Sequence, residues 1–230
     1  MALAAVGAGG GEQTLVLEIG AADLEPIRGA QLRILLARAS RTETPVLVWQ
    51  SLEPFEFNTV TWRWGEYGIY AATVAVVPGA RVTPVSVLPE AQASYYYSFP
   101  SSAVFQGPFW DAQVGPDRYG VQNAMPYRAY PQLTFGLQQA ALVNGVPVTA
   151  RPVTAETVLA NRMAIFAPVP VVYVWLTSGV ASSTIIAGVG PDAVAVDCSS
   201  GAAQTLIYDP ELGRFVPRQS TAAGAGMVGA

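Results

Sequence analysis

The chain has 230 residues, of which 51% are hydrophobic and only 12% are charged, and its formal net charge is −4 at pH 7. This charged share is about half of the ~25% that globular proteins carry on average. A surface with few charges resists self-association weakly, so the composition favours a protein whose surface is partly covered by a partner or by its own copies. A large core beneath a neutral polar surface explains the same composition and is the alternative.

The chain contains no histidine and no lysine, and all twelve of its basic residues are arginine. Catalytic pairs of serine or cysteine with histidine are therefore excluded within one chain, as are histidine-ligated metal sites. The absence of lysine excludes Schiff-base chemistry and the lysine of a phosphate-binding loop. The single cysteine, Cys198, forms neither an intramolecular disulfide nor a metal cluster. We therefore expect no metal and no cofactor.

Targeting and partner signals are also scarce. Residues 1–11 are rich in alanine and glycine and lack the basic start of a signal peptide, which favours the cytoplasm without fixing the localisation. No apolar stretch approaches the length of a membrane span. The acidic balance and the lack of a basic run argue against nucleic acid as a partner.

Short β-branched and aromatic runs recur between glycine, proline, asparagine and aspartate residues, which is typical of strands. The expected strands are residues 14–19, 31–38, 46–51, 59–64, 70–77, 81–88, 93–99, 133–142, 146–151, 169–177, 183–189, 193–198, 204–208 and 214–217. Because no helices separate them, the sequence predicts an all-β fold with an antiparallel β-sandwich architecture. We expect two sandwich-like halves, residues 14–100 and 132–218, with flexible tails at 1–13 and 219–230.

Four local features refine this prediction. Asn144-Gly145 between two apolar runs predicts a tight hairpin turn, because both positions of such a turn need a positive φ. Residues 154–163 are the best helix candidate, with Thr154 as the N-cap and Arg162 in the last turn. Residues 31–38 fit helical spacing as well as a strand, and their short length favours the strand. Residues 101–131, rich in proline, glycine and aromatic residues, are interpreted as an irregular bridge between the halves.

Aromatic residues supply the candidate ligand-binding site. In a strand, Trp62 and Trp64 project from one face, and Tyr95 and Tyr97 share a face of a later strand. Trp110 in the bridge adds a third segment, and the adjacent Arg118 and Tyr119 offer polar groups. The predicted site therefore comprises Trp62, Trp64, Tyr95, Tyr97, Trp110, Arg118 and Tyr119. The alternative is that these rings belong to the core, as most large aromatic residues of β proteins do.

Two functions from different classes follow. The first is a non-catalytic ligand-binding or self-assembling β protein, such as a lectin-like module, a toxin-like subunit or a shell component. Its partners would be a carbohydrate, a small apolar molecule or further copies of the chain. The second is a cofactor-free cyclase or isomerase that encloses an apolar substrate. Its acid or base would be a buried carboxylate or tyrosine, because burial raises the pKa of such groups.

Overall fold

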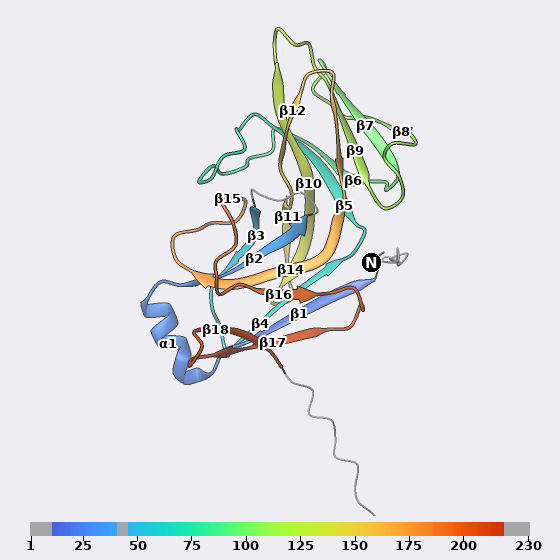
Figure 1. Cartoon of the computed structure of the whole chain (residues 1–230). Helices are drawn as coiled ribbons and strands as arrows, with labels where there is room; N and C mark the ends of the chain where they lie inside the picture. The colour runs from blue at the N-terminus through green and yellow to red at the C-terminus, as the bar shows by residue number, and fades with distance from the viewer. Residues whose placement is uncertain (1–10, 41–45, 219–230) are drawn as a thin grey trace, which may run out of the picture.

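The computed structural model describes residues 11–40 and 46–218, and these form eighteen strands and one helix. Figure 1 shows the strands gathered into one elongated body, with the pair β7 and β8 at one side of its upper part. The all-β prediction is confirmed. The strands belong to three sheets, which we describe in turn.

The largest sheet has nine strands and centres on β10 (Gln132–Val143). Its order is β18 (Arg214–Pro217), β17 (Gln204–Asp209), β1 (Glu12–Glu18), β4 (Phe57–Arg63), β10, β5 (Tyr67–Ala72) and β6 (Ser86–Ala91). Two further strands, β11 (Val146–Pro152) and β12 (Glu156–Leu159), also pair with β10. Strands from both predicted halves therefore lie in one sheet, with β10 paired to both β4 and β5.

The four-stranded sheet has the order β13 (Met163–Phe166), β9 (Tyr119–Ala124), β7 (Tyr95–Pro100) and β8 (Gln106–Trp110). The five-stranded sheet has the order β15 (Ile185–Ile186), β3 (Val46–Leu52), β2 (Arg33–Ser40), β14 (Pro168–Thr177) and β16 (Val194–Asp197). The expectation of purely antiparallel pairing is wrong in two places, because β1 runs parallel to β17 and β7 runs parallel to β9. The first pair joins strands from opposite ends of the chain, whereas β7 and β9 are separated only by β8.

One hydrophobic cluster takes side chains from all three sheets, including Leu15 of β1, Leu36 of β2 and Phe99 of β7. The neighbours of Leu36 along β2, Leu35 and Ala37, point the other way and pack with Trp175 in a separate cluster. This alternation follows from the two-residue period of a strand. It means that the strands β2 and β3 of the five-stranded sheet are buried on both faces, which explains their apolar runs.

The structure corrects two assignments of secondary structure. Residues 154–163 are not helical: β12 alternates the buried Val158 with exposed neighbours, and the Thr154 hydroxyl accepts a hydrogen bond from the Leu137 amide at 2.8 Å. Residues 101–131 are not an irregular bridge, since they contain β8 and β9. The helix that does exist, α1 (Ala21–Gly29), was missed because it contains Pro26 and buries only one side chain. The predicted turn is confirmed, with φ of 50° at Asn144 and 76° at Gly145.

The predicted strand at residues 31–38 is also confirmed, as β2. Of the predicted tails at residues 1–13 and 219–230, residues 1–10 and 219–230 lie outside the residues that the structure describes. The end of the first tail is a correction, because β1 begins at Glu12 and pairs there with β4.

At Gly136 of β10, the backbone of Thr154 passes directly against the strand. A Cβ atom there would overlap the Thr154 carbonyl oxygen and would lie 2.7 Å from the Tyr70 hydroxyl. The same hydroxyl donates a hydrogen bond to that carbonyl at 2.6 Å. The absence of a side chain at Gly136 therefore lets the segment that contains Thr154 pass directly over β10.

We predict that Gly136→Ala lowers the free energy of unfolding by about 3 kcal/mol or more, because the methyl group displaces backbone and not a flexible side chain. Gly29→Ala is the matched control: nothing lies within 4 Å of a Cβ atom there. Denaturant unfolding of the two variants checks this. Equal stability of both would show that the chain crosses β10 elsewhere.

Candidate functional site

The predicted site residues separate into a buried group and an exposed group. Trp62 lies in the core, with only 3% of its surface exposed, and Trp64 is half-buried beside it. Both rings face the Arg38 side chain, with guanidinium-to-centroid distances of 5.0 and 5.3 Å. The common face that the two-residue period predicts for the two indoles is therefore present, and it is turned inward.

Arg38 is a buried cation whose neighbours are mainly aromatic. Trp49 provides a third ring at 5.4 Å, and the Tyr67 hydroxyl accepts a hydrogen bond from Nη2 at 3.1 Å. No described carboxylate forms a salt bridge with Arg38, and its Nη1 has no hydrogen-bond partner. The faces of the indole rings carry partial negative charge, so they stabilise the guanidinium in place of a carboxylate. This cluster joins β2 and β3 of the five-stranded sheet to β4 of the largest sheet.

Tyr97 and Tyr119 also belong to the core. The Tyr97 hydroxyl accepts a hydrogen bond from the Gln92 amide at 2.9 Å, and the Tyr119 hydroxyl donates one to the Gly65 carbonyl at 2.8 Å. Burial, with a smaller contribution from Tyr67, raises the pKa of Tyr119 far above its usual value. Arg118 is half-buried, and its carbonyl accepts a hydrogen bond from the Ser94 amide. These three residues hold strands together and do not converge on one surface.

The remaining two predicted residues, Tyr95 and Trp110, lie side by side at an edge of the four-stranded sheet. They are paired directly across β7 and β8, so their side chains leave the same face. Trp110 is 73% exposed, which is unusual for a tryptophan. The next cross-strand pair, Tyr96 and Phe109, projects from the opposite face of the sheet, and the centroids of its two rings are 5.4 Å apart.

We call these four residues, Tyr95, Tyr96, Phe109 and Trp110, the aromatic ridge. It lies along β8, whose five residues are all exposed and uncharged. Figure 1 places β8 at the outer side of its sheet. Sequence reasoning found Tyr95 and Trp110 but left out Tyr96 and Phe109, because only the pairing of β7 with β8 brings Phe109 next to Tyr96. The result is an exposed edge strand with aromatic rings on both faces.

The backbone of β8 is less suited to contact than its side chains. Pro108 has no backbone N–H group to donate, and the pairing with β7 is irregular between Tyr96 and Ser98. A proline and a bulge both hinder the addition of another strand at a free edge. The ridge therefore offers its rings, more than its backbone, to any partner.

Other reactive groups are scattered through the described residues. The Cys198 thiol is buried, and this burial raises its pKa, which opposes formation of the nucleophilic thiolate. Burial also raises the pKa of Tyr70 beyond its usual range, and its hydroxyl donates to a backbone carbonyl. Residues 11–40 and 46–218 contain no group of three or more histidine, cysteine, aspartate or glutamate side chains placed to hold a metal ion. Within the same residues, no helix is long and apolar enough to cross a membrane.

Comparisons of the chain with protein families, with curated proteins and with solved structures find no match.

We predict that replacing the two tryptophans by alanine changes the free energy of unfolding to very different extents. Trp62→Ala removes a buried ring and is expected to lower the free energy of unfolding by about 3–5 kcal/mol through the cavity that it leaves. Trp110→Ala is expected to change it by less than about 1 kcal/mol, because an exposed ring supports little of the core. Thermal and denaturant unfolding of both variants test this. A comparable loss in Trp110→Ala would mean that the ridge is part of the core.

Proposed function

We propose that the protein is a non-catalytic β protein that assembles with copies of itself through the aromatic ridge. The observation that supports this most directly is the exposure of Trp110 beside Tyr95 on an uncharged edge strand. Tryptophan and tyrosine are the residues that contribute most to binding energy in protein interfaces. A complex in which a partner covers Trp110 would therefore be stabilised by burial of this ring.

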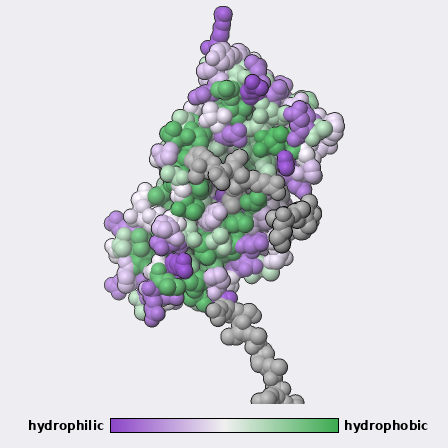
Figure 2. Space-filling view, in the orientation of Figure 1, coloured by the Kyte–Doolittle hydropathy of each residue, from purple (hydrophilic) through white to green (hydrophobic). Residues whose placement is uncertain are grey.

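The composition favours a second copy as that partner. With 12% charged residues and a net charge of −4, two copies repel one another weakly. Figure 2 shows hydrophobic residues on the visible face, interspersed with hydrophilic ones. The simplest arrangement is a pair of ridges packed against one another about a two-fold axis, since isologous dimers are the commonest oligomers.

The shape of the ridge bears on the other partners. The rings of the ridge lie on two faces of an exposed strand, whereas sites for small molecules are concave and bury most of their ligand. A sugar ring stacked on Trp110 is the carbohydrate alternative, and the same variants test it. The hypothesis of a cofactor-free enzyme requires a buried acid or base facing a substrate; Tyr70 is buried, but its hydroxyl is bound to the Thr154 carbonyl.

We predict that the wild-type protein has a solution mass of at least twice the 24.2 kDa of one chain. Trp110→Ala and Phe109→Ala should each shift the mass toward a single chain, because each removes part of the proposed contact. Phe57→Ala is the matched control, since Phe57 is also an exposed aromatic residue but lies on β4 of another sheet. Light scattering coupled to size exclusion measures all four proteins.

A wild-type protein that stays monomeric over the accessible concentration range would contradict self-assembly. An oligomer that persists in both ridge variants would place the interface elsewhere. If the wild type is monomeric and binds an immobilised glycan through Trp110, carbohydrate binding replaces self-assembly as the function of the ridge.

A further inference from the structure

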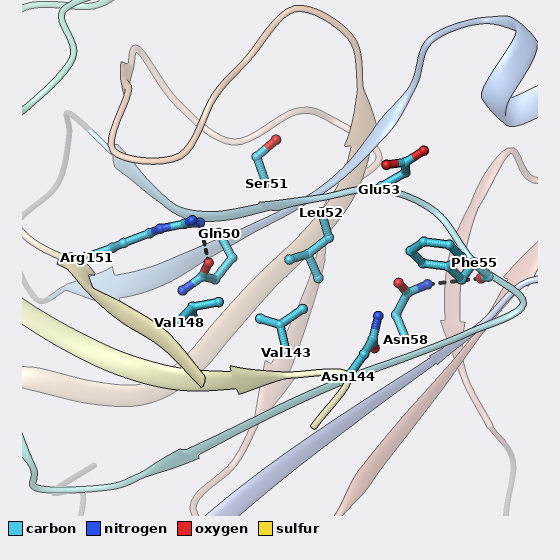
Figure 3. A pocket seen from close by; sticks show the side chains of 10 residues that line it. All are labelled: Gln50, Ser51, Leu52, Glu53, Phe55, Asn58, Val143, Asn144, Val148 and Arg151. Carbon is cyan, nitrogen blue, oxygen red and sulfur yellow. Dashed lines mark hydrogen bonds between the residues drawn. The ribbon is translucent and has the colours of Figure 1, made fainter. Parts of the chain in front are cut away.

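A cleft with a mixed polar and apolar lining lies away from the aromatic ridge, between β3, the β10–β11 hairpin and the segment that joins β3 to β4. Its volume is about 220 Å³. Figure 3 shows Arg151 at one end of the cleft, with Asn58 and Glu53 toward the other. Leu52, Val143 and Val148 line the part between them. The cleft therefore combines a cationic end with an apolar middle.

Arg151 is held in place by uncharged partners. Its Nη1 donates hydrogen bonds to Gln50 Oε1 and to Ser182 Oγ, both at 2.6 Å. Within residues 11–40 and 46–218, its Nε and Nη2 atoms have no acceptor, and it forms no salt bridge. Burial, together with the positive charge of Arg81, lowers the pKa of Arg151 below its usual value. The guanidinium thus lacks a counter-charge and keeps free donors.

Two amide side chains that line the cleft also have unused hydrogen-bonding atoms. Gln50 is completely buried, and because its Oε1 binds Arg151, its Nε2 is left as a donor without an acceptor. Asn58 is equally buried: its Nδ2 donates to the Phe55 carbonyl, and its Oδ1 has no donor. Leaving such groups unpaired costs about 1–3 kcal/mol each. An acceptor on a ligand that pairs with Gln50 Nε2 recovers this energy, whereas Asn58 Oδ1 needs a hydrogen-bond donor.

We propose that this cleft binds a small organic carboxylate, with the carboxylate at Arg151 and Gln50 and the apolar body over Leu52, Val143 and Val148. A planar guanidinium with two free donors matches the two oxygens of a carboxylate. The apolar lining selects an organic acid over an inorganic anion, because it offers a phosphate or sulfate ion no hydrogen bonds. The volume accommodates a chain of a few carbon atoms and is smaller than typical drug-sized sites.

The probe for this proposal is hexanoate, titrated into the full-length protein and followed by nitrogen-15 NMR of the backbone and of the arginine Nε groups. We expect saturable shifts at Arg151 and at the cleft residues. Hexanamide, which has the same body without the charge, should bind at least about tenfold more weakly, since charge-assisted hydrogen bonds are about twice as strong as neutral ones. Inorganic phosphate tests whether the charge alone suffices.

Three variants and one control separate the contributions. Arg151→Gln removes the charge and should weaken hexanoate binding about tenfold or more. Val148→Phe leaves Arg151 in place and fills the apolar middle, so it should weaken hexanoate more than acetate. Glu53→Gln removes a negative charge from the cleft and should strengthen binding. Arg214→Gln changes an exposed arginine on β18 and should have no effect.

Each of several results would overturn the proposal. One is the absence of saturable shifts with hexanoate in the wild-type protein. Another is equal binding of hexanoate and hexanamide, which would remove the role of the guanidinium. Binding of phosphate without hexanoate would show that the cleft selects an inorganic anion. If Arg151→Gln does not fold, unchanged hexanoate binding in Val148→Phe would still exclude the proposed position of the ligand.

Discussion

The middle of β10, around Gln139, is the junction on which the arrangement of the sheets depends. Residues 132–138 of β10 pair with β12 and β5, and residues 142 and 143 pair with β4. Strand β11 pairs along residues 138–143, with a register shift between Gln139 and Ala141 that places an extra residue on β11. The Gln139 carbonyl accepts a hydrogen bond from Trp49 Nε1 at 3.1 Å, and its side-chain amide donates to the Arg63 carbonyl at 2.7 Å. One residue thus ties β3 of the five-stranded sheet to the end of β4. The Arg38 cluster forms at this junction, because the same Trp49 ring packs edge-to-face against Trp62 with centroids 5.6 Å apart.

Much of the strand content was readable from local patterns, whereas the sheet topology was not. Period-two runs and the Asn144-Gly145 turn act over neighbouring residues, and both were predicted correctly. The parallel pairing of β1 with β17 joins residues about two hundred positions apart, such as Leu15 and Gln204. No local signal specifies such a contact, since its stability comes from burial that forms only in the complete fold. The error at residues 154–163 has the same origin: Thr154 and Glu156 favour a helix locally, but pairing with β10 is decided by tertiary contacts.

The candidate sites show the same division. The sequence placed Trp62 with Trp64 and Tyr95 with Tyr97 on common faces, but it did not say which faces are covered. Tyr97 is buried, and Tyr95, at the start of the same strand, is only half-buried beside the exposed Trp110. The carboxylate cleft was missed entirely, because Gln50, Asn58 and Arg151 come from three segments and none belongs to a motif. The only signal of the cleft in the sequence is the presence of polar residues inside otherwise apolar strands. Such residues indicate a site only when the structure shows that their side chains are buried.

The scarcity of charge also explains how the sheet edges are protected and why the rings remain for contact. Charged residues, prolines and short length are the usual means of preventing strands from adding to a free edge. Of the eight strands with a single partner in the described sheets, β6, β8, β11 and β18 each contain an exposed proline, and β12, β13, β15 and β16 have only two to four residues each. A chain with so few charges therefore limits backbone pairing by proline and by length. Neither device covers a side chain, so Phe109 and Trp110 stay accessible on a strand whose backbone is a poor partner. Contact through the rings has a defined geometry, whereas strand addition at an open edge can continue from one copy to the next. Assembly through the rings, as proposed above, therefore favours closed complexes over fibrils.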